Sequence, residues 1–168
     1  MSVPFMPRSP VPPISAMKAM FGDSFFYILY FQEPGVADAD LGADPARTMR
    51  GLLAGAVSAG GVVGAGADRD RADGFVARLP QPDDLPPWLA QAELDHYVEE
   101  FARTGFSGGL NWYRNLDRNW LTTPELEAVR VTAPSLFIGG ALDPVLVMMP
   151  PALMDGWVED HRGTVIVD

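Results

Sequence analysis

The sequence lacks cysteine altogether and contains only two histidines, His96 and His161, among its 168 residues. Without cysteine the chain forms no disulfide, no thiolate metal site and no cysteine nucleophile. Two histidines are also too few for the multi-histidine sites that commonly hold zinc. We therefore expect no metal site.

Positive charge is scarce as well. There are 12 Lys and Arg residues against 22 Asp and Glu, so the net charge is −10. Such a chain repels phosphate groups, which argues against nucleic acid and anionic membranes as partners. The proline-punctuated residues 1–16 hold no apolar core of a secretory signal, and six glycines make the uncharged stretch 51–67 a poor membrane span. We expect a soluble, cytoplasmic protein.

Helical patterns dominate the first 120 residues. The pair Asp44-Pro45 is a good helix start, because Asp is a preferred N-cap and Pro suits the first helical position. Residues 90–103 carry apolar side chains at i, i+3, i+4 and i+7, which predicts an amphipathic helix with one apolar face: Leu94, Tyr97, Val98 and Phe101. A second helix is predicted over 109–120. The polar, proline-rich residues 68–87 are predicted to be a surface connection.

The last third of the chain has the pattern of a parallel α/β sheet. Residues 135–138 form a short apolar run that ends at Gly139-Gly140, which is typical of a buried strand. A helical pattern follows, and then a second strand is predicted over 164–167. Strand, loop, helix and strand in this order make one βαβ unit. One such unit after a long helical section indicates part of a larger α/β protein.

Three residues are candidates for chemistry. Asp143 follows the first predicted strand, where open α/β sheets place their working residues, although an aspartate before proline is also a common turn residue. Tyr27 and Tyr113 lie in aromatic segments, and taken singly each is best explained as a core aromatic. If His161 begins the second strand, it lies at the end of the sheet opposite Asp143, so the two cannot form a catalytic pair.

Three blocks of sequence together resemble the soluble epoxide hydrolases of the α/β-hydrolase superfamily. The first runs from Tyr27 to Gly35 (YILYFQEPG) and is followed by Arg47-Thr48. The second runs from Gly105 to Asn115 (GFSGGLNWYRN), and the third from Pro134 to Asp143 (PSLFIGGALD). The blocks occur in family order. The resemblance implies a connection over residues 1–24, a helical cap domain over 25–130 and a partial C-terminal core over 131–168.

The resemblance also implies a reaction and roles for named residues. In this family an aspartate attacks an epoxide carbon to form an alkyl-enzyme ester, two cap tyrosines bind the epoxide oxygen, and a histidine oriented by an acid activates water. The tyrosines match Tyr27 and Tyr113, and the acid matches Asp143. Val145 and Trp112 are expected to contact the substrate. The implied partner is a small epoxide, with no cofactor.

Parts of the family pattern do not occur in this sequence. The nucleophile's Gly-His-Asp-Trp-Gly-like motif, the His-Gly-x-Pro motif and the Gly-His-Trp context of the catalytic histidine are all missing. We therefore expect the 168-residue chain to be inactive alone and to self-associate through uncovered core surface. Two alternatives stay open: a non-catalytic relative or binding module, and another cap-bearing hydrolase such as a haloalkane dehalogenase. The paired tyrosines argue against the dehalogenase, because a halide leaving group needs no proton.

Overall fold

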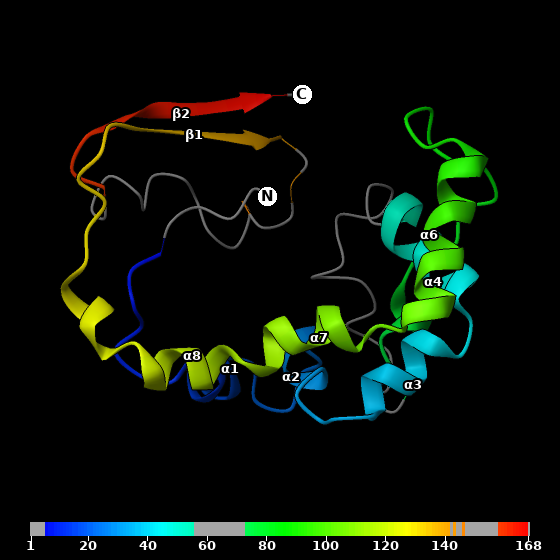
Figure 1. Ribbon diagram of the computed structural model, residues 1–168, viewed down its shortest axis with the longest axis horizontal. Helices are drawn as coiled ribbons and strands as arrows, with labels where there is room; N and C mark the ends of the chain where they lie inside the picture. The colour runs from blue at the N-terminus through cyan, green and yellow to red at the C-terminus, as the bar shows by residue number, and fades with distance from the viewer. Residues whose placement is uncertain (1–5, 56–72, 142, 144–145, 147–157, 168) are drawn as a thin grey trace. The chain divides into compact units, whose positions relative to one another are not determined.

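The computed structural model describes residues 6–55, 73–141, 143, 146 and 158–167. The chain forms two compact units, Ile14–Asp117 and a second that combines Met1–Pro13 with Arg118–Asp168. In the first unit the described elements are helical (Figure 1): α1 (Pro13–Phe21), α2 (Tyr27–Tyr30), α3 (Val36–Gly42), α4 (Pro45–Arg50), the π-helix η1 (Gly51–Gly55), the 3₁₀-helix η3 (Val76–Arg78), α6 (Gln91–Thr104) and α7 (Ser107–Arg114). Among the described residues, no helix combines the length and apolarity needed to cross a bilayer.

The start of α4 is confirmed in detail. Asp44 is its N-cap, and its Oδ1 accepts a hydrogen bond from Arg47 N at 3.0 Å, while Pro45 occupies the first turn. Helix α6 is confirmed to within one residue at each end. It stops at Gly105, whose φ of +70° is a backbone conformation that favours glycine.

The predicted helix 109–120 is instead two helices, α7 and α8 (Leu116–Thr122), separated at Asn115. The backbone N of Asn115 donates to Asn111 O at 3.1 Å, and its side-chain Nδ2 donates to the same oxygen at 2.7 Å. Asparagine often competes with helical hydrogen bonding in this way. The break leaves Tyr113 in the last turn of α7.

The core of the first unit corrects two sequence predictions. Residues 73–87 are not simply a surface connection, because Phe75, Val76 and Leu79 are buried among core side chains from α3, α4, α6 and α7. In α6, Leu94 faces this core as predicted, but Tyr97 is 42% exposed. The polar composition of the segment led to the prediction of an exposed connection, although the apolar residues within 75–79 are buried.

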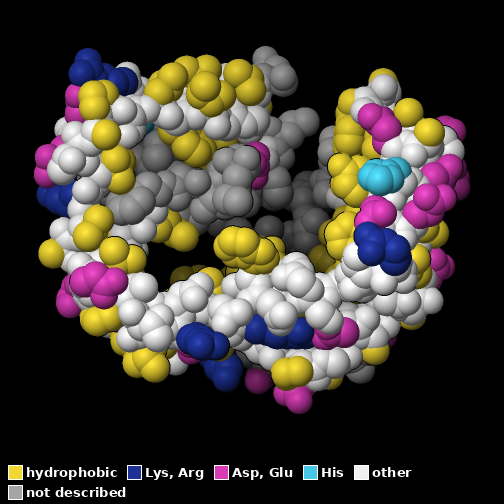
Figure 2. All heavy atoms as spheres, viewed as in Figure 1, with side chains coloured by type: hydrophobic (Ala, Val, Ile, Leu, Met, Phe, Trp, Pro, Cys, Tyr) yellow, Lys and Arg dark blue, Asp and Glu magenta, His cyan; other side chains and the backbone are white. Residues whose placement is uncertain are grey.

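The second unit contains a two-stranded parallel sheet. Strand β1 (Ser135–Gly140) pairs with β2 (His161–Val167), so the parallel arrangement is confirmed. The prediction that β1 is buried is wrong within this chain, since Leu136 and Ile138 are 57% and 55% exposed. Figure 2 shows hydrophobic side chains gathered over the two strands. Among the described residues no third strand pairs with this sheet. The 3₁₀-helix η4 (Pro124–Ala128) connects α8 to β1.

Candidate functional site

The first unit brings Tyr27 and Tyr113 together from two different helices. Tyr27 opens α2 and Tyr113 lies near the end of α7. Their ring centroids are 5.7 Å apart with an interplanar angle of 83°, an edge-to-face contact. Phe31 touches both rings, at centroid distances of 5.6 Å from Tyr27 and 5.4 Å from Tyr113. The two phenols therefore share one apolar environment.

Burial controls the protonation of the two phenols. It is the main cause that raises the pKa of Tyr27 to about 12, and the charge of Tyr113 and a hydrogen bond between the two side chains raise it further. Burial also raises the pKa of Tyr113, partly offset by its hydrogen bond with Tyr27. Both groups stay protonated at neutral pH. A pair of neutral phenols can donate hydrogen bonds to one ligand oxygen and stabilise negative charge that develops on it.

A single amide connects the backbones of the two helices that carry the phenols. Gln32 Nε2 donates to Ile28 O in α2 at 2.9 Å and to Tyr113 O in α7 at 3.1 Å. The amide lies just beyond the C-terminus of α2. It therefore links the last turn of α7 directly to the helix that begins with Tyr27.

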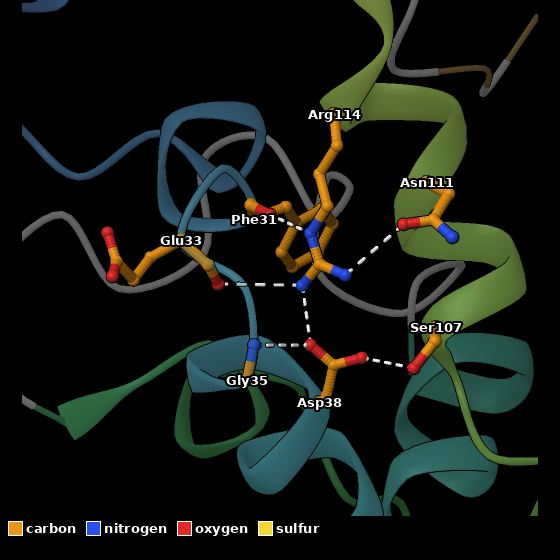
Figure 3. Close-up of polar contacts among 7 residues, drawn as sticks. All are labelled: Phe31, Glu33, Gly35, Asp38, Ser107, Asn111 and Arg114. Atoms are coloured by element: carbon orange, nitrogen blue, oxygen red, sulfur yellow. Dashed lines mark hydrogen bonds and ion pairs between the residues drawn. The ribbon is translucent and has the colours of Figure 1, made fainter.

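An ion pair between Arg114 and Asp38 links α7 to α3 (Figure 3). Arg114 Nη2 lies 2.5 Å from Asp38 Oδ2, and the two side chains are only 14% and 23% exposed. Arg114 Nε also donates to Phe31 O at 2.9 Å. Asp38 accepts hydrogen bonds from the Ser107 hydroxyl and from Gly35 N. Hydrogen bonds, first from Arg114 and then from Ser107, hold the pKa of Asp38 well below its usual range.

The serine in this network lies in a Gly-x-Ser-x-Gly run over residues 105–109. In hydrolases that spacing marks a nucleophile elbow, which needs a strand before the serine and a helix after it. Here helix α6 precedes the run, and the Ser107 hydroxyl donates to Asp38. Ser107 therefore has a structural partner and does not lie on an elbow.

Asp143 lies in the second unit, just after β1. Its backbone N donates to Gly140 O at 3.0 Å, which closes a tight turn at the end of the strand. His161 begins β2 and pairs with Ser135 at the start of β1, so the predicted placement of His161 and Asp143 at opposite ends of the sheet is confirmed. Among the described residues no group of three or more His, Asp or Glu side chains could hold a metal ion.

Of the two residues expected to contact the substrate, the structure describes Trp112 but not Val145. Trp112 lies on α7 beside Tyr113, and its side chain is 78% exposed. Val145 lies outside the described residues. Sequence reasoning gave no role to Gln32, Asp38 or Arg114. Gln32 and Arg114 stand inside the quoted sequence blocks, which was the one available signal for them.

Curated proteins with sequences similar to this chain are named epoxide hydrolases. Epoxide hydrolase A of Mycobacterium tuberculosis (strain ATCC 25618 / H37Rv) is 57% identical over 149 residues, which cover 87% of this chain and 46% of that protein. Bifunctional epoxide hydrolase 2 of Mus musculus is 33% identical over 159 residues, covering 94% of this chain and 28% of that protein. No protein-family model matches the chain.

Solved structures agree with the sequence comparison. The crystal structure of epoxide hydrolase A from Mycobacterium thermoresistibile superposes with a TM-score of 0.84 at 50% identity, covering 99% of this chain and 52% of that chain. An epoxide hydrolase from an endophytic Streptomyces gives a TM-score of 0.81 at 33% identity, with 98% and 51% covered. The chain thus spans about half the length of these two solved relatives.

The chain has the fold of an α/β hydrolase and corresponds to its cap and part of its core. The helices bring two tyrosines together, and a parallel strand pair with an acid after its first strand follows them. Within that superfamily the relatives that the chain matches are epoxide hydrolases, and the chain corresponds to about half of their length.

Proposed function

We propose that this chain supplies the oxygen-binding half of an epoxide hydrolase site, which converts an epoxide and water to a vicinal diol. The observation that supports this function is the Tyr27–Tyr113 pair, two neutral phenols in edge-to-face contact within an apolar cluster. An epoxide opens when a nucleophile attacks one ring carbon and the C–O bond breaks. The oxygen then carries negative charge, which the two hydroxyls stabilise before one of them transfers a proton to it.

The remaining steps need a carboxylate nucleophile and a histidine, as the resemblance to the family implies. A carboxylate nucleophile forms an ester with the ring carbon, and a histidine-activated water cleaves this ester to release the diol and restore the carboxylate. In this proposal Asp143 orients that histidine, and Trp112 and Val145 contact the substrate. Residues 25–130 are the cap domain, 131–168 belong to the core, and 1–24 connect the two.

Neither histidine of this chain suits the role beside Asp143. His161 pairs with Ser135, and the strand from Ser135 to Gly140 advances about 17 Å at about 3.3 Å per residue before the Asp143 turn begins. His96 lies on the exposed face of α6. We therefore expect the 168-residue chain by itself to form no diol.

An immunoblot of the source cells, with an antibody raised against this chain, is the first test. A band well above 18.2 kDa is expected, and the protein captured with that antibody should convert styrene oxide to its diol. A band at 18.2 kDa with no activity would overturn the proposal and favour a binding or vestigial role.

Substitution of the tyrosines tests the site itself, in a recombinant form of the protein that the antibody captures. Tyr27→Phe and Tyr113→Phe should each lower kcat/KM about 100-fold, the lower end of what a positioned proton donor contributes. Tyr97→Phe is the matched control, because Tyr97 is exposed on α6 and should leave the rate unchanged. Equal rates for all three variants would refute the assignment.

A further inference from the structure

We infer, resting on the function proposed above, that Arg114, Asp38 and Gln32 form a clamp that positions the two phenols, with Arg114 as its central residue. None of the three is expected to touch the substrate. They would act through the backbone, by holding α7 against the segment that follows α2. Figure 3 shows the side chains of Arg114 and Asp38 directed toward each other from α7 and α3.

Arg114 holds two backbone segments at once. It is the last residue of α7 and directly follows Tyr113, so any movement of its backbone moves that phenol. Its Nε donates to the carbonyl of Phe31, the residue that caps the C-terminus of α2 and touches both phenol rings. One guanidinium therefore joins the end of the helix carrying Tyr113 to the end of the helix carrying Tyr27.

Asp38 fixes the guanidinium in that orientation. Its carboxylate pairs with Arg114 and also accepts hydrogen bonds from Gly35 N at 2.9 Å and from the Ser107 hydroxyl. Ser107 and Arg114 are seven residues apart, about two turns, so they lie on the same face of α7. Asp38 thus holds both ends of α7 against the start of α3.

Gln32 completes the clamp from the other side. Its side-chain Nε2 donates hydrogen bonds to the carbonyl oxygen of Tyr113 and to that of Ile28 in α2. The clamp therefore fixes the backbone at Tyr113, at Phe31 and at Ile28. Tyr113 belongs to the phenol pair, Phe31 contacts both phenols, and Ile28 directly follows Tyr27.

The geometry requires arginine and not merely a positive charge. A planar guanidinium can donate from Nε to one acceptor and from Nη2 to another in fixed directions, whereas a lysine ammonium is a single point. Arg114→Lys keeps the charge near the phenols, so its effect on them reports geometry and not electrostatics.

The test is a ¹⁹F NMR titration of the 168-residue chain labelled with 3-fluorotyrosine. Fluorination lowers phenol pKa values, so the hydroxyls ionise at a lower pH, and Tyr→Phe variants assign the signals. In the unaltered chain both phenols of the pair should ionise above free 3-fluorotyrosine. In Arg114→Lys we expect the Tyr27 midpoint to fall by roughly one pH unit, half of its elevation, because the opened site admits water.

Two control variants separate positioning from general loss of stability. Arg103→Lys alters an exposed ion pair on α6, with Glu100, and should move neither midpoint. Thr48→Val removes a buried hydrogen bond from the Thr48 hydroxyl to Leu41 O, which involves none of the three clamp residues, and it should lower the melting temperature without moving the midpoints. A similar shift in Thr48→Val would show that the phenols report stability alone and would overturn the inference.

If Arg114→Lys does not fold at neutral pH by circular dichroism, Gln32→Leu takes its place with the same expected direction. Unchanged midpoints in a folded clamp variant would overturn the inference. Midpoints equal to free 3-fluorotyrosine in the unaltered chain would overturn it as well. Because no substrate is present, a positive titration together with an inactive whole protein would refute the proposed function and leave the clamp intact.

Discussion

Replacing Asp38 with asparagine tests how much the charged network contributes to the stability of the helical unit. The carboxylate accepts hydrogen bonds from Arg114, Ser107 and Gly35 N. Asparagine keeps one acceptor oxygen and places an NH₂ group where the other was, so at least one charge-assisted hydrogen bond is lost. A hydrogen bond to a charged group contributes about 1.5–3 kcal/mol. We therefore expect Asp38→Asn to lower the free energy of unfolding by about 2 kcal/mol at pH 7.

The pH dependence of this difference gives the sharper test. The pKa of Asp38 is held below its ordinary value of 3.8 in the folded chain. A group with a lowered folded-state pKa contributes stability that is fully present above its unfolded-state pKa and is lost as the pH falls through the folded-state value. The difference between the two chains should therefore be constant from pH 7 to about 5 and should shrink below about 4.

Urea unfolding followed by tryptophan fluorescence measures both chains at each pH. Glu100→Gln is the matched control, because its partner Arg103 is 69% exposed and such pairs contribute about 0–1 kcal/mol. A difference for Asp38→Asn that stays the same down to pH 2.5 would refute an ionic origin. A difference no larger than that of the control would show that the pair with Arg114 adds nothing.

Three further predictions follow from the described contacts. Asp44→Ala removes the N-cap bond to Arg47 N and should cost about 1 kcal/mol in the same urea assay, while Asp44→Ser should restore most of it. Burial is the main cause of the raised pKa of Tyr27, and Tyr113 raises it further, so Tyr113→Phe should lower the Tyr27 midpoint in the ¹⁹F titration but leave it above that of free 3-fluorotyrosine. A midpoint that does not move would contradict the coupling. We expect the chain to self-associate through the exposed apolar face of β1, so Ile138→Thr, which removes a side chain 55% exposed there, should weaken this association in sedimentation velocity. An unchanged profile would exclude this face as the contact.

The sequence alone was sufficient where the deciding interactions are local. The Asp44 cap reaches only three residues, and the α6 pattern repeats within one helix, so both could be predicted. The parallel pairing of β1 and β2 followed from two apolar runs around one helical pattern. Family resemblance, and not periodicity, singled out Tyr27 and Tyr113.

Only the tertiary structure decided which distant residues meet. Arg114 and Asp38 are 76 positions apart, and no local pattern pairs one arginine with one of many carboxylates. The burial of Phe75 depends on the helices that pack around it, so the polar composition of its segment predicted the wrong environment. Helix starts depend on bonds that span a few residues, whereas the tyrosine pair and its clamp depend on packing between helices, which a linear sequence does not reveal.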